Sequence, residues 1–205
     1  MVKNPQRRTK LLDAAIDVLA DHGARGLTFR AVDNRAEVPT GTASNYFTNR
    51  DDLLRQAAEY VFVRLTTEPD GGHTVTETGP GNENALMREM VRLAEADRNG
   101  YLAMYELRLE AGRRPELRHA FTRQFRRNLD RIGDTYEKGG HPGGRATAVL
   151  LYLAMSGLVL EHLTLPDVLN VDDRLITTLV NAIVPQRGTV TGLTSPPDDR
   201  HAEPH

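Results

Sequence analysis

The chain has 205 residues, no cysteine and a formal net charge of −2, from 26 Lys and Arg against 28 Asp and Glu. This length allows one or two domains, and the lack of cysteine excludes a disulfide framework and thiolate metal sites. The near-zero charge does not suggest a protein that binds nucleic acid over its whole surface. No apolar run follows the basic N-terminal residues as a signal peptide would require, so we expect a cytoplasmic protein.

Charge is unevenly distributed along the chain. Residues 1–50 hold eight Lys and Arg against five Asp and Glu, whereas the remainder holds 18 against 23. A basic N-terminal region on an acidic body suits a chain that contacts phosphate at one end only.

The first expected helix begins at Asn4, a good N-cap, with Pro5 in the first helical position. Leu12 and Ile16 belong to a broad apolar stripe at helical period, and Gly23 is placed to end the helix. The basic first turns of this helix either contact phosphate or form a solvated tip.

Residues 28–50 contain two short helical patterns. The first covers residues 28–36, with Thr28 as its N-cap. The second covers residues 40–47 and is too short to be stable without packing. A tight break at residues 37–39 separates the two.

The second of these helices has two different faces. Ala43 and Phe47 form the expected inward face, and the outward face carries Thr42, Asn45 and Tyr46. This arrangement is typical of a helix-turn-helix whose second helix enters a DNA groove. It fits an ordinary helical hairpin equally well.

A third helical pattern follows a cap at Thr48 or Asn49, with Asp51 and Asp52 in its first turn, where the helix dipole favours acids. Two apolar edges over residues 51–67 would let this helix pack on the preceding region and on a second unit at once, so we interpret it as a connector. The Gly- and Pro-rich segment that follows, residues 68–83, is expected to be a flexible loop.

Further helices are expected between this loop and Pro185, at residues 86–100, 101–112, 115–138, 146–160 and 172–184. The helix expected at residues 146–160 is nearly all apolar. Fifteen helical residues reach only ~22 Å, against a hydrocarbon core of roughly 30 Å, so we expect burial between the protein's own core and a partner rather than a membrane span. Gly157 would allow another helix to approach closely.

The first 60 residues resemble the TetR family of bacterial transcriptional regulators. The resemblance lies in the segments LLDAAIDVLADHGARGLTFRAV, VPTGT and NYFTNRDDLL. It implies an all-α fold of about nine helices, with a three-helix helix-turn-helix head and a six-helix ligand-binding and dimerisation body. The expected divisions are a DNA-binding domain at residues 1–50, a body at 51–185 that starts with the connector at 51–67, and a disordered tail at 186–205.

The resemblance also implies roles for particular residues. The expected DNA-binding residues are Thr28, Arg30, Thr40, Gly41, Thr42, Asn45, Tyr46 and Arg50. The guessed effector-binding residues are Met87, Met104, Tyr105, Arg108, Phe121, Phe125 and Tyr152, for each of which plain core packing is the alternative. The expected dimer interface contains Leu150, Leu153, Gly157, Leu158, Leu179 and Ile183.

Three positions depart from the family pattern. Glu37 stands where the turn usually has Gly, at a cost on the order of 1 kcal/mol if the backbone there needs a positive φ. Pro39 replaces the usual Ser cap, so we expect a backbone donor of the second helix to lose its side-chain partner. Ser44 replaces an aromatic residue that often touches phosphate.

The function implied is that of a repressor that binds a palindromic DNA operator as a homodimer and is released by a small-molecule effector, without a cofactor, a metal or a membrane. An activator would share these sequence features. No His pair has metal-binding spacing on a helix and no phosphate-binding loop occurs, so we do not expect an enzyme. The alternative is a helical small-molecule-binding or scaffold protein whose head does not bind DNA.

Overall fold

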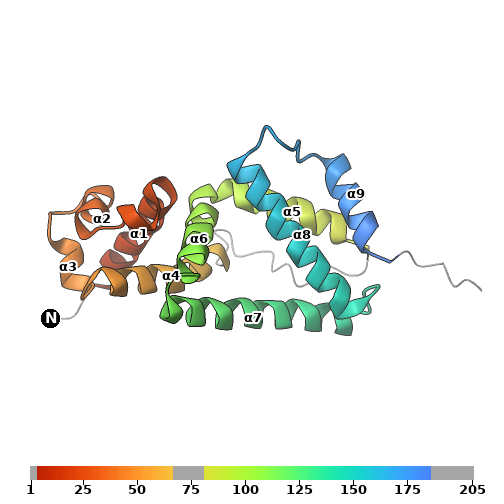
Figure 1. Ribbon diagram of the computed structural model, residues 1–205, viewed down its shortest axis with the longest axis horizontal. Helices are drawn as coiled ribbons and strands as arrows, with labels where there is room; N and C mark the ends of the chain where they lie inside the picture. Colours follow the sequence, from red (N-terminus) through yellow and green to blue (C-terminus); the bar gives the residue numbers. More distant parts are fainter. Residues whose placement is uncertain (1–3, 67–80, 186–205) are drawn as a thin grey trace, which may run out of the picture.

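The computed structural model describes residues 4–66 and 81–185, and these residues form nine helices and no strand. The expected all-α fold is therefore confirmed, and the expected flexible loop and disordered tail lie almost wholly outside the described residues. The helices are α1 (Pro5–Gly26), α2 (Phe29–Arg35), α3 (Thr42–Tyr46), α4 (Arg50–Thr66), α5 (Glu83–Ala96), α6 (Arg98–Ala111), α7 (Pro115–Lys138), α8 (Gly144–Thr164) and α9 (Asp173–Ile183). Figure 1 shows α1–α3 gathered at one end of an elongated molecule, α6 in the middle, and α5, α8 and α9 toward the other end.

Helix α1 begins where the sequence predicts. The Asn4 side chain accepts from the backbone N–H groups of Gln6, at 3.0 Å, and Arg7, at 3.4 Å. Gly23 breaks the helical geometry with φ of 65°, and one further turn then reaches Gly26. The broad apolar stripe is buried, because it faces both α2 on one side and α6 on the other.

Helix α4 is capped by a reciprocal pair of side-chain and backbone bonds. The Asn49 side chain accepts from the Asp52 N–H at 2.8 Å, and the Asp52 carboxylate accepts from the Thr48 N–H at 3.0 Å. Both expected apolar edges are buried, against α1 on one side and against α6 and α7 on the other. A single core cluster consequently runs from α1 through α4 to Leu107 and Phe121.

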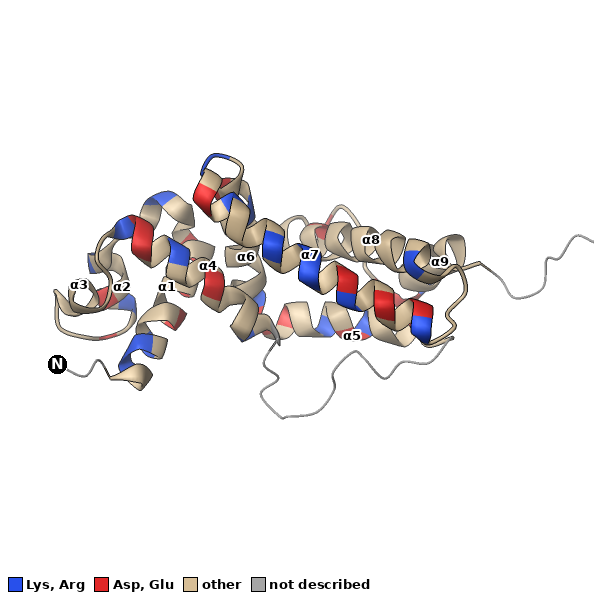
Figure 2. Cartoon of the chain, turned by 90° about the horizontal axis from the view of Figure 1, so that it is seen from below, with Lys and Arg blue, Asp and Glu red and all other residues tan. Residues whose placement is uncertain are grey.

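Helix α8 is longer than the sequence predicts. It has 21 residues and contains an 18-residue window with a mean hydropathy of 1.6, so it is long and apolar enough to cross a membrane, and the argument from a 15-residue length is wrong. The helix extends past its apolar stretch because its polar ends find partners: Arg145 pairs with Asp130 and Asp134 of α7, and His162 bonds to Glu95 of α5 at 2.7 Å. It packs against α5, α7 and α9. Figure 2 shows α8 almost free of charged residues beside the strongly charged α7.

Candidate functional site

The short helix α3 is anchored by a buried acid from α2. The Asp33 side chain is 1% exposed, and its two carboxylate oxygens accept from the N–H groups of Gly41 and Ala43, each at 2.7 Å. A carboxylate at this end of a helix also complements the helix dipole. The expected loss of a capping partner at Pro39 is therefore wrong, because Asp33 supplies the cap from another helix.

The inward face of α3 is as the sequence predicts, but the helix is shorter than expected and only part of its expected outward face is exposed. Ala43 and Phe47 are 0% and 1% exposed. Asn45 is exposed on the outer side, while the Thr42 hydroxyl donates to the Pro39 carbonyl at 2.6 Å. Tyr46 is half-buried against the head core. The outward surface of α3 is thus small, polar and held at a fixed angle.

The turn between α2 and α3 contains a strained residue. Glu37 has φ of 51° and is the only non-glycine residue with a positive φ in the part of the chain that the structure describes. For a residue with a Cβ, this conformation costs on the order of 1 kcal/mol. The cost that the sequence suggested for Glu37 is therefore present.

Arg50, expected to hold a phosphate, is bound to the protein's own backbone. Its guanidinium donates to the carbonyl oxygens of Leu27, at 2.9 Å, and Ala24. These bonds tie the start of α4 to the end of α1, and any phosphate contact would have to form in addition to them.

Other expected DNA-binding residues lie on the surface near α3. The Thr28 hydroxyl accepts from the Ala31 N–H at 3.1 Å, so Thr28 is the N-cap of α2. Thr40 and Gly41 are exposed in the turn. Arg30 is exposed and has no hydrogen-bond or ion-pair partner among residues 4–66 and 81–185, which leaves its guanidinium free for an external anion.

Three phenylalanines form a cluster where the connector meets the body. Phe62 of α4 packs edge-on against Phe121 and Phe125 of α7, with ring centroids 5.1 and 5.2 Å apart. The Arg108 guanidinium carbon lies 5.0 Å from the centroid of Phe125, in cation–π contact. Sequence reasoning missed Phe62; its signal was its place on the apolar surface of the connector.

The remaining guessed effector residues divide between two parts of the body. Met104 is buried in the same core as Phe121, and the Tyr105 hydroxyl donates to the Ser156 carbonyl at 3.0 Å. Burial, with smaller contributions from neighbours that include Tyr152, raises the pKa of Tyr105 to about 12. Met87 lies in a separate core cluster among α5, α7, α8 and α9, so it is not grouped with the others.

Helix α8 carries an exposed apolar stripe. Leu150, Leu153 and Leu160 are 50%, 57% and 39% exposed, and Gly157 lies between them on the same face. Spacings of three and four residues are those of a helix that packs against another helix. Leu158 was also expected on this exposed surface, but it is 7% exposed and belongs to the subunit's own core. The other two expected residues, Leu179 and Ile183, are half-buried against that core.

A buried acid–histidine pair closes the far end of the body. Glu83 and His141 bond through Oε1 and Nδ1 at 3.0 Å, and the ring of Tyr136 stacks on His141 with centroids 4.3 Å apart. This pair, which the sequence did not suggest, joins the start of α5 to the loop before α8. Within the described ranges, no three His, Cys, Asp or Glu side chains are close enough to hold a metal ion.

Two family patterns match this chain. Residues 11–57 match the bacterial regulatory proteins of the tetR family, and residues 82–186 match the tetracyclin repressor-like C-terminal domain. The second match alone covers about half of the chain, and together they cover the head and the body. The chain belongs to the TetR family of bacterial regulatory proteins, which confirms the resemblance found in the sequence.

Individual relatives agree with this assignment. The transcriptional regulator BetI of Klebsiella pneumoniae is 35% identical over 75 residues, which cover 33% of this chain and 38% of BetI. A TetR-family protein of Streptomyces coelicolor, SCO1917, is 26% identical with a TM-score of 0.67, covering 89% of this chain and all of that one. The multidrug binding protein EbrR, complexed with imidazole, is 27% identical with a TM-score of 0.62, covering 91% of this chain and 99% of EbrR.

Proposed function

We propose that the protein is a homodimeric transcriptional repressor that binds a palindromic DNA operator and is released by a small-molecule effector. The observation that carries the proposal is the Asp33 cap, which holds α3 with Asn45 exposed on the face opposite the buried Ala43 and Phe47. A reading helix must be fixed in this way, because its side chains have to meet base edges in one register.

On the DNA, α3 enters the major groove and Asn45 reads a base, since its amide can pair with adenine at two positions. Arg30 contacts the phosphate backbone, and Thr28, Thr40, Gly41, Thr42 and Tyr46 position α3 in the groove. Arg50 contributes by holding α4 to α1, through its bonds to Ala24 and Leu27. A protein that makes these contacts acts on DNA in the cytoplasm and does not need a membrane.

The second subunit packs on the exposed stripe of α8. Leu150, Leu153 and Leu160 lose their contact with water there. Each is already about half-buried in one subunit, so each contributes about half of the roughly 1.5–3 kcal/mol that a fully buried leucine gives. Gly157 lets the two α8 backbones approach closely. Two-fold symmetry then requires two operator half-sites with centres roughly 34–36 Å or more apart.

The effector binds in the body beside the aromatic cluster, where Tyr105, Arg108, Phe121 and Phe125 lie on adjoining helices. That EbrR, a relative of the same fold, is a multidrug binding protein supports a small-molecule site. Phe62 links this cluster to α4, so a ligand that displaces the rings also displaces the connector. Release follows if the effector favours a head spacing that does not fit the operator.

The test is selection from random duplexes at low salt, followed by affinity measurements on the enriched sequence and on its single-base variants. Asn45→Ala should relax the preference at one base pair of each half-site, while Arg30→Gln should weaken binding to all sequences alike and reduce its salt dependence. Arg126→Gln, at an exposed position on α7, is the matched control and should leave both properties unchanged.

Failure of the wild-type dimer to bind any duplex at low salt would overturn the proposal in favour of a ligand-binding or scaffold protein. Identical profiles for Asn45→Ala and Arg30→Gln across operator variants would overturn the division between base reading and phosphate contact. A small-molecule thermal-shift screen tests the effector: a compound that stabilises the protein and weakens operator binding is expected, and Phe125→Ala should lose that response.

A further inference from the structure

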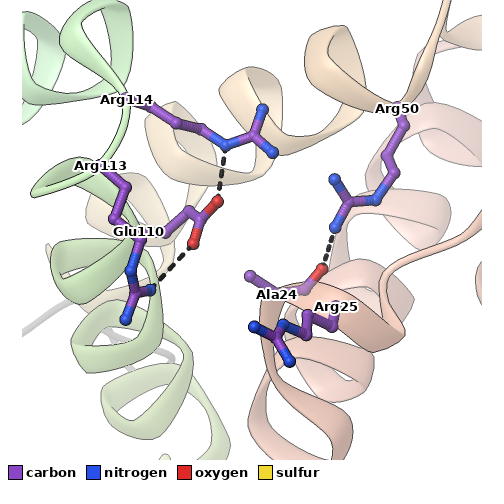
Figure 3. Close-up of a pocket in the computed structure, with 6 residues that line it drawn as sticks. All are labelled: Ala24, Arg25, Arg50, Glu110, Arg113 and Arg114. Carbon is purple, nitrogen blue, oxygen red and sulfur yellow. Dashed lines mark hydrogen bonds and ion pairs between the residues drawn. The ribbon is translucent and has the colours of Figure 1, made fainter.

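A cleft of about 290 Å³ lies where the head meets the body, and no residue of the aromatic cluster lines it. Ala24 and Arg25 of α1 and Arg50 at the start of α4 form one wall. Glu110 at the end of α6, with Arg113 and Arg114 just after it, forms the other. Figure 3 shows these two walls facing each other across the gap.

Positive charge in this cleft is only partly neutralised. Glu110 accepts from Arg113 at 3.3 Å and from Arg114 at 2.6 Å, and Arg114 also pairs with Asp51. Arg50 is bound to neutral carbonyl groups, and Arg25 has no partner of any kind among the residues described.

Four guanidinium groups therefore face two carboxylates. A third acid, Glu106, lies beside the cleft, with its carboxylate 3.3 Å from where a side chain at Gly23 would begin. Cations still exceed acids when Glu106 is counted.

We propose that this cleft binds a phosphate-type anion, which bridges Arg25 and Arg50 of the head and Arg113 and Arg114 of the body. Like charges held across a cleft repel, and an anion with several oxygens removes that repulsion while it accepts hydrogen bonds from both walls. The planar fork of a guanidinium matches the oxygen geometry of phosphate, so the site favours phosphates over a single-atom anion such as chloride.

An adjoining cleft is a poorer site for an anion. It measures about 370 Å³ and shares Arg113 and Arg114, but it also contains Asp51 and Glu116. Its third cation, Arg55, is already paired with Asp52 at 2.7 Å and with Glu59 at 2.9 Å. The charges of that cleft are nearly balanced, so it offers an anion little.

The bound phosphate comes either from a free small anion or from the backbone of DNA that reaches this part of the head. In both cases the anion bridges the head and the body, so it fixes the angle between them. The binding claim does not rest on the proposed repressor function, because the first experiment uses no DNA.

The first experiment titrates inorganic pyrophosphate into the full chain by calorimetry at low chloride. We expect saturable binding that becomes at least ten-fold weaker in Arg25→Gln and in Arg113→Gln. Arg126→Gln removes an exposed arginine of α7 that does not line the cleft, so it should bind as the wild type does. The thermal unfolding curve of each variant, measured without anion, separates loss of binding from loss of fold.

A variant that is expected to bind the anion more tightly controls for a general loss of structure. Glu110 competes with the anion for Arg113 and Arg114, and its hydrogen bond with Arg114 holds the pKa of Glu110 below its usual range, so it is charged at neutral pH. Glu110→Gln keeps the size of the side chain and removes the competing charge. We expect this variant to bind pyrophosphate at least three-fold more tightly than the wild type.

Fluorescence anisotropy with a duplex then identifies the source of the phosphate. If pyrophosphate binds as expected, the site takes a free anion. If pyrophosphate does not bind but Arg25→Gln and Arg113→Gln each weaken duplex binding at least five-fold relative to Arg126→Gln, the phosphate belongs to DNA. If neither ligand distinguishes these variants from the control, the site does not exist.

Discussion

The head and the body of this protein bury their apolar side chains to very different extents. Ten of the twelve largest fully buried side chains lie between Leu11 and Val61, in α1–α4 and the turns between them. All eight exposed large hydrophobic residues in the described part of the chain occur at Val63 or later. Val63 is the one exposed large hydrophobic residue of α1–α4 that is described, so the head and most of the connector bury their apolar side chains within one subunit, whereas the body leaves apolar surface uncovered.

This difference suits two different tasks. The proposed reading helix, α3, has five residues, so it has no stability of its own and needs rigid support, which Asp33, Ala43 and Phe47 provide. A body that joins a partner and admits a ligand instead needs surface that other molecules can cover. The predictions below test whether buried contacts in the head support α3 and whether a second copy completes the body.

The largest expected effect is on assembly. Leu153→Arg places two arginines against each other at the proposed two-fold interface, which costs several kcal/mol and should make the protein monomeric. Leu153 is 57% exposed in one subunit, so the fold itself should survive. Sedimentation equilibrium measures the change. Leu109→Arg, at a 64% exposed leucine of α6, is the control and should remain dimeric; monomers of both variants, or of neither, would contradict the assignment.

The second prediction concerns the support of α3. Asp33→Ala leaves the N–H groups of Gly41 and Ala43 without their acceptor, and we expect a loss of about 2–3 kcal/mol in the free energy of unfolding. Urea unfolding measures the loss, and hydrogen exchange should speed up at those two amides. Asp21→Ala, which removes an exposed acid paired with Arg35 at 3.3 Å, should cost under about 1 kcal/mol. Equal losses for the two variants would show that Asp33 has no special role.

The third prediction is a pH dependence at the start of α4. A hydrogen bond from Gln56, and next one from the Thr48 backbone, lowers the pKa of Asp52 from 3.8 to about 2. Because the folded state holds the ionised form, this stabilisation is complete above the unfolded pKa and is lost as pH falls from about 4 toward 2.

Asp52→Asn should therefore cost about 1–2 kcal/mol at pH 7, after allowance for solvent screening, and almost nothing near pH 2. Urea unfolding of both proteins over this pH range measures the difference. Glu59→Gln alters an exposed acid paired with Arg55, and it should lower the free energy of unfolding by less than about 0.5 kcal/mol at any pH. A constant cost for Asp52→Asn at every pH would rule out the titration.

The smallest expected effect is a gain in stability. Glu37→Gly removes the steric cost of a positive φ and should raise the free energy of unfolding by about 1 kcal/mol. Glu37→Ala keeps the Cβ and should bring no such gain, which separates backbone relief from the loss of charge. Chemical denaturation of the wild type and the two variants measures the free energies of unfolding. A gain in stability in Glu37→Ala would show that loss of the Glu37 charge, rather than backbone relief, is the cause.

Local chemistry was enough to predict where α1 and α2 begin and which side of α3 is buried. The Asn4 and Thr28 caps and the buried pair Ala43 and Phe47 are all found in the structure. Each depends on residues within a few positions of one another, so period and capping rules are sufficient to locate them.

Features that join distant parts of the chain could not be predicted in this way. Asp33 bonds to groups eight and ten residues away, Arg50 bonds to carbonyls 23 and 26 residues away, and Phe62 meets rings of α7. Leu158 was expected at the dimer interface but is buried within the subunit, because α8 is apolar nearly all round, which leaves no polar side to set its orientation. The cleft arginines likewise come together only when α6 packs on α1.

The Asp33 cap has a consequence for how such a protein diverges. The residues that hold α3 in place are all buried, whereas Thr40, Ser44 and Asn45 are exposed. Under the proposed function, substitutions at the exposed positions alter the operator sequence that is recognised at little cost in folding free energy. Duplicated copies of the gene could acquire new target promoters through a few codons while they inherit the same scaffold.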